Sequence, residues 1–244
     1  MIMERQSGCH FCNAAGKRNC PACAGQICAS CCGTGRGSRI QCPAECVYYP
    51  FGTKAYDSWL RVDGGWTREA LAFAADNCKE ELSRLARKLG PEMDDELMRK
   101  GVSYVYAVHY LLSTWKNEKG QTLADIWEEQ GWNGLDNDEQ VMMRYRRNTM
   151  PGILEIQKVL NDHASECRDL LDPDRGVFLL FDRTIAGAAT RFSQFLTWIT
   201  HYPHFARVVG IGVEISQQAR EIFMDEIRKL PVKPGEKNSG KGRR

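Results

Sequence analysis

Long apolar runs and a signal-peptide pattern are both missing from this sequence of 244 residues. No run of about 18 consecutive apolar residues occurs, which argues against a membrane-spanning helix. The opening residues MIMERQSG contain no apolar segment of signal-peptide length. We therefore expect a soluble, cytoplasmic protein with no membrane partner. In a reducing compartment structural disulfides are rare, so a dense group of thiols is better explained as metal ligands than as crosslinks.

The common catalytic signatures are missing as well. The sequence contains no GxSxG elbow, no P-loop and no HExxH motif, and GIGVEI at 210–215 lacks the third glycine of a dinucleotide loop. Four acids surround the turn DPDRG, namely Asp169, Asp172, Asp174 and Asp182. They leave open a metal-dependent hydrolase as a third hypothesis, although aspartate is common at turns because its side chain caps the backbone. No catalytic residue is predicted.

Cysteine is scarce after residue 46, where only Cys78 and Cys167 occur, but nine thiols lie between Cys9 and Cys46. Eight of them form four closely spaced pairs: Cys9 and Cys12, Cys20 and Cys23, Cys28 and Cys31, and Cys42 and Cys46. A Cys-x2-Cys pair places two sulfurs from one tight turn on the same ion, and Zn²⁺ prefers four such ligands in a tetrahedron. Four pairs therefore predict two zinc ions.

The order of the pairs favours an interleaved arrangement. Only four residues separate Cys23 from Cys28, so the second and third pairs would be crowded around one ion. Interleaving assigns Cys9, Cys12, Cys28 and Cys31 to one zinc, and Cys20, Cys23, Cys42 and Cys46 to the other. Because adjacent cysteines rarely bind one tetrahedral ion, either Cys31 or Cys32 is predicted to be a spare thiol. An iron–sulfur cluster uses the same type of ligand and stays an alternative.

This order of pairs resembles the B-box type of zinc finger, above all in the segment NCPACAGQICASCC. B-boxes usually close with histidines, where this chain has Cys42 and Cys46. The resemblance implies a cross-brace module that mediates protein–protein interaction. The segment CASCCGTG is similar to part of one DnaJ-type CxxCxGxG repeat. A CCGxxRxxxIxCPxxCxY pattern is also similar to uncharacterised bacterial proteins and implies no function.

Basic residues suggest an alternative, a nucleic-acid or ribosome-binding protein. Seven of them lie in the module or in the segment RYRR: Lys17, Arg18, Arg36, Arg39, Arg144, Arg146 and Arg147. The tail PVKPGEKNSGKGRR adds five basic residues against one acid. A simpler explanation is that cations offset the charge of zinc thiolates and favour a helix C-terminus. A protein partner is the leading hypothesis, and no feature indicates an oligomeric state.

The whole chain is predicted to have an α+β fold. We expect a two-zinc module at 1–50, an aromatic connector at 51–66, a helical region at 67–150, a small antiparallel β-sheet with a closing helix at 151–230, and a disordered basic tail at 231–244.

Apolar periodicity and cap residues place the helices within this scheme. The first is expected to run from an N-cap at Thr67 to Leu89, and later ones to occupy 94–115, 122–129 and 137–147. Asn137 or Asp138 is the expected cap of the last of these.

Overall fold

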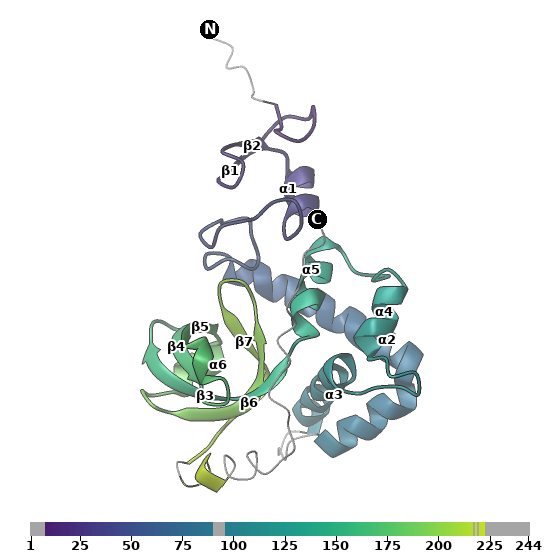
Figure 1. The fold of residues 1–244 in the computed structure, drawn as a ribbon, viewed down its shortest axis with the longest axis vertical. Helices are drawn as coiled ribbons and strands as arrows, with labels where there is room; N and C mark the ends of the chain where they lie inside the picture. The colour runs from purple at the N-terminus through teal and green to yellow at the C-terminus, as the bar shows by residue number, and fades with distance from the viewer. Residues whose placement is uncertain (1–7, 90–95, 217, 219, 223–244) are drawn as a thin grey trace.

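The computed structural model describes residues 8–89, 96–216, 218 and 220–222. Its first part is a small cysteine-rich module, which lies at one end of the molecule (Figure 1). The module contains an antiparallel pair of short strands, β1 (Arg18–Cys20) and β2 (Gly25–Ile27), followed by a short helix, α1 (Ala29–Gly35). Turns make up the rest of it, so few backbone hydrogen bonds between regular elements hold its shape.

Four helices follow the module: α2 (Tyr56–Leu89), α3 (Glu96–Ser113), α4 (Leu123–Glu129) and α5 (Asn137–Arg146). The expected connector at 51–66 is wrong in its second half, because α2 already begins at Tyr56 rather than after Thr67. Trp59 and Trp66 are both fully buried, and a spacing of seven residues places them on one helix face. Burial of these rings outweighs the low helix propensity of the two glycines at 64–65.

The later helices agree with expectation, and their caps explain where they begin. Thr122 caps α4 in a reciprocal capping box with Asp125. The predicted cap of α5 is wrong, since Asp136 takes that place and accepts a hydrogen bond from the Glu139 amide at 2.9 Å. The Glu139 carboxylate in turn accepts from the Asp136 amide, so the true cap precedes the expected ones.

Five strands form a closed barrel in the order β3-β4-β5-β7-β6. They are β3 (Met150–Val159), β4 (Ala164–Asp169), β5 (Val177–Phe181), β6 (Gln194–His201) and β7 (Ala206–Glu214). A 3₁₀ turn, η1 (Pro173–Arg175), precedes β5, and a short helix, α6 (Arg183–Ala188), follows it. The expectation of a small antiparallel sheet is therefore wrong in part, because the sheet closes on itself and β5 pairs with β7 in parallel.

The strand order of the barrel is specific. Counted from its first strand the order is 1-2-3-5-4, with strands 3 and 5 parallel and a helix between strands 3 and 4. This arrangement is similar to that of the OB-fold, a five-stranded Greek-key barrel. Apolar side chains from all five strands, such as Leu154, Cys167 and Phe195, fill its interior.

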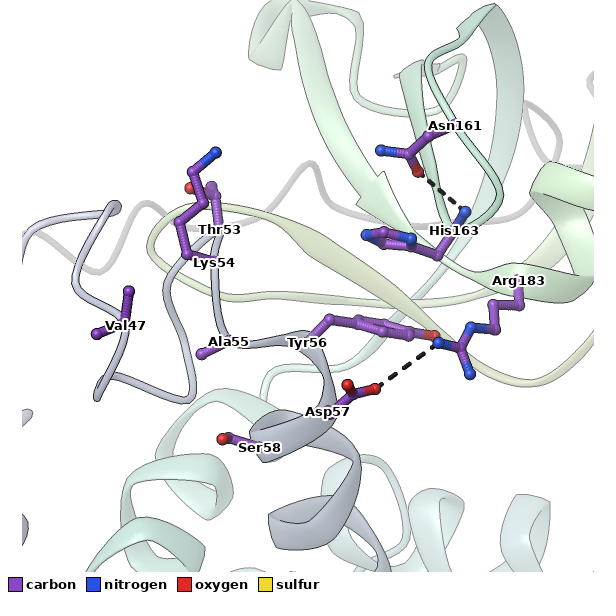
Figure 2. A pocket seen from close by; sticks show the side chains of 10 residues that line it. All are labelled: Val47, Thr53, Lys54, Ala55, Tyr56, Asp57, Ser58, Asn161, His163 and Arg183. Atoms are coloured by element: carbon purple, nitrogen blue, oxygen red, sulfur yellow. Dashed lines mark hydrogen bonds and ion pairs between the residues drawn. The ribbon is translucent and has the colours of Figure 1, made fainter.

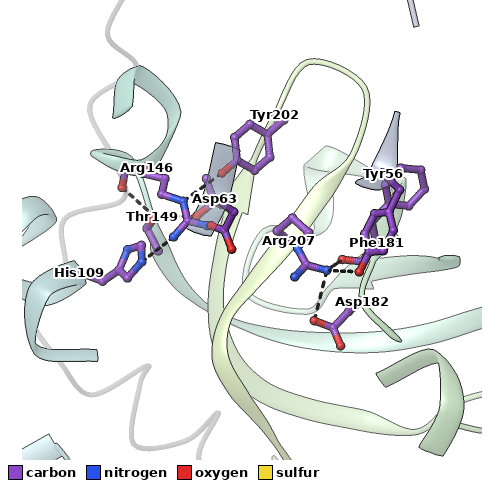
Figure 3. Close-up of polar contacts among 10 residues, drawn as sticks. Tyr56, Asp63, His109, Arg146, Thr149, Phe181, Asp182, Tyr202 and Arg207 are labelled. Carbon is purple, nitrogen blue, oxygen red and sulfur yellow. Dashed lines mark hydrogen bonds and ion pairs between the residues drawn. The ribbon is translucent and has the colours of Figure 1, made fainter. Parts of the chain in front are cut away.

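A buried arginine joins the helices to the barrel (Figure 3). The Arg146 side chain, on α5, lies over the Trp66 ring at 4.4 Å and donates to the Tyr202 hydroxyl at 3.1 Å and to Asp63. Nη1 of Arg146 contacts Nε2 of His109 at 2.6 Å. Burial, and then Arg146, lowers the pKa of His109 well below its usual value, so this ring is neutral and accepts from the guanidinium.

A second arginine, Arg207 on β7, ties the start of α2 to the barrel. Its guanidinium lies over the Trp59 ring at 4.4 Å, donates to the Tyr56 hydroxyl at 3.2 Å, and forms an ion pair with Asp182 at 3.5 Å. Buried charges are tolerated only when they are paired in this way. Helices and barrel therefore pack through fixed polar contacts as well as a shared apolar core.

The β-sheet region was expected to end in a closing helix before a disordered tail at 231–244. Residues 217, 219 and 223–244, and with them the whole tail, lie outside the described residues. Ile222 is 61% exposed. In the part of the chain that the structure describes, no helix has the length and apolar character needed to cross a membrane.

Candidate metal centre

Four thiols of the module converge on one point. The sulfur atoms of Cys9, Cys12, Cys28 and Cys31 all lie within 4.8 Å of one another. These residues are the first of the two sets that the interleaved arrangement assigns to one ion. Among the described residues, no other group of three or more His, Cys, Asp or Glu side chains is gathered so closely.

Two short structures bring these pairs together. The turn that carries Cys9 and Cys12 is closed by a hydrogen bond from the Cys9 amide to the Ala14 carbonyl at 2.8 Å. Cys28 is the N-cap of α1, and its thiol accepts a hydrogen bond from the Cys31 amide at 3.3 Å. The buried Ile27, at the end of β2, fixes the entry to this helix. The sulfurs of Cys12 and Cys28 approach to 3.8 Å.

The thiols of this group differ in pKa. Hydrogen bonding, chiefly from the Cys28 backbone, lowers the pKa of Cys9 to about 6. The neighbouring thiols, Cys12 first and then Cys28, raise the pKa of Cys31 to about 12. Four sulfurs at this distance cannot all ionise without a cation, and a divalent metal ion supplies the missing charge. Four thiolates in a closed group are the ligand set of a structural zinc site.

The second predicted set is more open. Cys20 and Cys23 flank the turn between β1 and β2, and the Cys23 thiol lies 3.9 Å from the Cys20 carbonyl oxygen. Cys42 and Cys46 lie in a turn that the Cys46 amide closes on the Pro43 carbonyl at 3.1 Å. Among the described residues, the sulfur atoms of this second set are not gathered as closely as those of the first.

Polar contacts dock the module on α5. Arg36 forms an ion pair with Asp138 at 3.1 Å, with side-chain exposures of 13% and 17%. The Asn137 amide donates to the Gly33 carbonyl at 2.6 Å, and Arg144 donates to the Gly37 carbonyl at 3.3 Å. Because these contacts come from the first turn and the last turn of α5, the helix holds the module along its length.

Close packing completes this contact. Gly37 has a φ of +70°, and a Cβ atom there would lie 2.7 Å from a methyl group of Val141. On the barrel side, Nε2 of His204 lies 3.4 Å from the Cys42 carbonyl. The module is therefore fixed to both the helices and the loop between β6 and β7.

Three of the basic residues predicted for nucleic-acid binding are paired or buried within the fold. Arg36 is paired with Asp138, Arg146 is only 4% exposed, and Arg147 forms ion pairs at 2.6 Å with both Asp125 and Glu128. These three arginines make contacts within the fold, and their assignment as nucleic-acid contacts stays a prediction.

The remaining candidates lie nearer the surface. Lys17 and Arg144 are exposed, Arg18 lies over the Tyr48 ring at 4.6 Å, and Arg39 lies over the Phe11 ring at 4.9 Å.

Two of the four acids named for a hydrolase, Asp169 and Asp182, have structural roles. The Asp169 carboxylate accepts hydrogen bonds from the amides of Ile153 at 3.1 Å and Leu171 at 2.9 Å. Asp182 caps α6 through the Ile185 amide at 2.9 Å. The two carboxylates serve different turns and do not form a group that would hold a metal ion, so the structure gives the hydrolase hypothesis no support.

A polar cavity of about 530 Å³ lies where the end of the module, the start of α2 and the loop between β3 and β4 meet (Figure 2). The His163 ring stacks on Tyr56 at 4.8 Å, and Arg183 pairs with Asp57 at 3.7 Å. Sequence patterns did not indicate this cavity, because its lining comes from segments more than 100 residues apart. The described residues thus form a cysteine-rich module, with four thiols that could hold a metal ion, docked on a body of helices and a five-stranded barrel.

Comparison with protein-family models, with curated proteins and with solved structures found no match for this chain.

Proposed function

We propose that this protein is a zinc-binding, non-enzymatic recognition protein whose cysteine-rich module is shaped by metal and contacts a protein partner. The observation that carries the proposal is the approach of four cysteine sulfurs to within 4.8 Å of one another. A site with four thiolate ligands leaves no open position for a substrate, which favours a structural role for the metal. The remaining thiols of the module supply the ligands of a second zinc ion.

The apolar surface of the module supports a protein partner. Phe11, Val47 and Tyr48 are large apolar side chains that are 37%, 61% and 39% exposed. The guanidinium groups of Arg18 and Arg39 lie over the rings of Tyr48 and Phe11. Aromatic residues and arginine are enriched at protein interfaces and supply much of their binding energy.

The charge of the loaded module also favours a protein over a phosphate backbone. Between residues 8 and 50 there are four basic side chains and one acid, Glu45. Each zinc with four thiolates carries a formal charge of about −2, so two such sites bring the module to about −1. A nucleic acid gains little from long-range attraction to a module of that charge.

Nucleic-acid binding is a second candidate, and the strand order of the barrel favours it. OB-folds bind oligonucleotides on the face of their second and third strands, here β4 and β5. In this protein part of that face is covered, since Ala164 and Phe181 are each 3% exposed and Tyr56 packs edge-on against Phe181. A nucleic acid would therefore have to use the exposed cations of the module.

Affinity capture with two matched variants tests the proposal. Val47→Asp places a charge on the module surface, and Val213→Asp does the same at an exposed valine of β7. We expect wild type and Val213→Asp to retain the same protein in high salt after nuclease treatment, and Val47→Asp to lose it with its zinc content unchanged. Capture that disappears with nuclease or salt would support the second candidate instead.

A further inference from the structure

A second polar cavity, of about 460 Å³, lies where β7 ends. The loop before β6, one residue of β3 and the residues that follow β7 complete its lining. β7 begins next to the loop that contacts the module, so this cavity lies at the opposite end of the strand from the module. Its volume is in the range of sites that bind small molecules.

The Gln194 side chain gives this cavity an unpaired hydrogen-bond acceptor. Its Nε2 donates to Oε2 of Glu155 at 2.8 Å, which fixes the orientation of the amide, because the reverse orientation would set its oxygen against a carboxylate. The Oε1 atom is buried and has no hydrogen-bond partner among the described residues, and the residue as a whole is only 8% exposed. Since an unpaired buried acceptor is destabilising, a ligand N–H that reaches this oxygen removes a cost.

The Phe192 ring lines the same cavity. It is 55% exposed, and its backbone has a φ of +70°, which is unfavourable for a bulky side chain. Hydrogen bonds hold this backbone in place, from the Phe192 amide to the Ile156 carbonyl at 2.7 Å and from the Ser193 amide to the Thr190 carbonyl at 3.1 Å. The Arg191 guanidinium lies over the ring at 4.6 Å. An exposed aromatic ring held in this way offers a stacking surface to a planar ligand.

Glu214 adds a second acceptor near Gln194. Its carboxylate is exposed and has no ion-pair or hydrogen-bond partner in the part of the chain that the structure describes. The amide of the next residue, Ile215, donates to the Gln194 carbonyl at 2.9 Å, so the two acceptors come from neighbouring strands. An ionised carboxylate accepts hydrogen bonds and donates none. The cavity therefore suits a planar ligand that carries adjacent N–H donors.

We propose that this cavity binds a guanine nucleotide, with the base stacked on Phe192 and its N1–H and N2 amino groups directed at Gln194 and Glu214. Guanine carries these two donors side by side, whereas adenine, cytosine and uracil place an acceptor next to their donor. Acceptors alone therefore favour guanine, just as a carboxylate favours the parallel donors of arginine. The terminal torsion of glutamine is soft, so a small rotation turns Oε1 toward the base. Arg191 and Arg220, which also line the cavity, supply cations for the phosphate.

This site is separate from the proposed recognition of a protein by the module. In the described part of the chain, no residue of the module lines the cavity. It also differs from the face of β4 and β5 that an oligonucleotide would use by the OB-fold arrangement. The guanine site can therefore fail while the proposed function stands, and the reverse also holds.

Equilibrium dialysis of the full chain against labelled nucleotides tests the site. Guanosine monophosphate should bind, and adenosine monophosphate should bind at least about tenfold more weakly, because it cannot donate to both acceptors. Ribose 5-phosphate, which has no base, should not bind. Equal affinity for the two nucleotides, or no binding of guanosine monophosphate at about 1 mM, would overturn the proposal unless the guanine is taken from a strand.

Guanine reaches such a site either in a free nucleotide or in a single strand, and a second pair of probes separates the two sources. The oligonucleotide UUGUU is compared with UUUUU under the same conditions. Tighter binding of UUGUU than of both UUUUU and guanosine monophosphate assigns the site to a strand, whereas tighter binding of guanosine monophosphate assigns it to the free nucleotide. No preference for guanine in either pair of probes overturns the proposal.

Two variants separate the ring from the acceptors. Phe192→Gly removes the unfavourable φ, so it should keep or raise the melting temperature while weakening guanine binding about tenfold. Glu214→Gln replaces an acceptor by an amide and should lower the preference for guanine over adenine about tenfold. Tyr104→Ala and Glu118→Gln, at exposed positions elsewhere, are the matched controls and should leave binding unchanged. Unchanged guanine binding in both Phe192→Gly and Glu214→Gln would overturn the assignment.

Discussion

Arg36 of the module and Asp138 of α5 face each other at 3.1 Å in a largely buried ion pair. This ion pair joins the cysteine-rich module to the body of the protein. The Arg36 guanidinium lies near the Cys42 thiol as well as Asp138 of α5. Substitutions in the module should therefore affect its contact with the helix.

Replacing Arg36 by alanine should destabilise the docked module. The change leaves the Asp138 carboxylate half-enclosed without its cation, and the loss of one partner from a buried pair costs about 2–3 kcal/mol when the pair is partly solvated. Urea denaturation measures the effect. Arg168→Ala, at an exposed position of β4, is the control and should change the free energy of unfolding by less than about 0.5 kcal/mol. Equal effects of the two substitutions would contradict the docking role.

Replacing Arg146 by methionine should lower the free energy of unfolding by more than Arg36→Ala does. Methionine keeps the apolar contact with Trp66 but leaves Asp63 and Tyr202 without their donor, and breaking such a buried pair costs about 3–5 kcal/mol. Arg144→Met lies on the same helix at an exposed position and is the matched control. If both variants unfold at the same urea concentration, Arg146 is not the link between helices and barrel.

Replacing Gly37 by alanine tests close packing at the same interface. A positive φ disfavours alanine, and its Cβ would press on Val141 at 2.7 Å, so we expect a loss of about 2 kcal/mol or more. Gly176 has a similar φ of +72° but open space around it, so Gly176→Ala reports the backbone cost alone. Thermal unfolding should place Gly37→Ala below Gly176→Ala, and the reverse order would show that the module does not press on α5.

Stability should fall in acid partly because of His201. Burial, with a smaller effect of Arg175, lowers the pKa of His201 from 6.5 to about 4. A depressed folded-state pKa means that the unfolded chain takes up a proton first, so stability that is present above pH 6.5 is lost between pH 6.5 and about 4. The slope contributed by one histidine is at most about 1.4 kcal/mol per pH unit.

The variant His201→Gln should remove this part of the slope, whereas His10→Gln, in the exposed first turn of the module, should leave it in place. Comparing unfolding of the two variants across this range separates the histidine from any loss of metal in acid. The same pH slope in both variants would be evidence against a buried neutral His201.

Local patterns predicted much of the fold. Apolar periodicity placed α3, α4 and α5 within a few residues, and the β-sheet was expected over 151–230, the region that holds the barrel strands. The start of α2 was not predicted, because the two adjacent glycines at 64 and 65 have low helix propensity. Burial of Trp59 and Trp66 on one face of the helix outweighs that propensity. Closure of the barrel was missed because the parallel pairing of β5 with β7 depends on contacts distant in sequence.

The cysteine spacing predicted which thiols form the first site, since Cys-x2-Cys turns and the short gap after Cys23 restrict how the pairs combine. Adjacency predicted a spare thiol at Cys31 or Cys32, and of these two it is the Cys31 sulfur that belongs to the four-thiol group. The docking of Arg36 and the burial of Arg146 depend on tertiary contacts, so both looked like free cations in the sequence.

X-ray absorption at the zinc edge, on protein purified without added metal, tests the central claim most directly. The account predicts zinc surrounded by four sulfur atoms at about 2.3 Å, with close to two ions per chain by elemental analysis of the same sample. Protein without metal, iron in place of zinc, or a shell that contains nitrogen or oxygen ligands would contradict it.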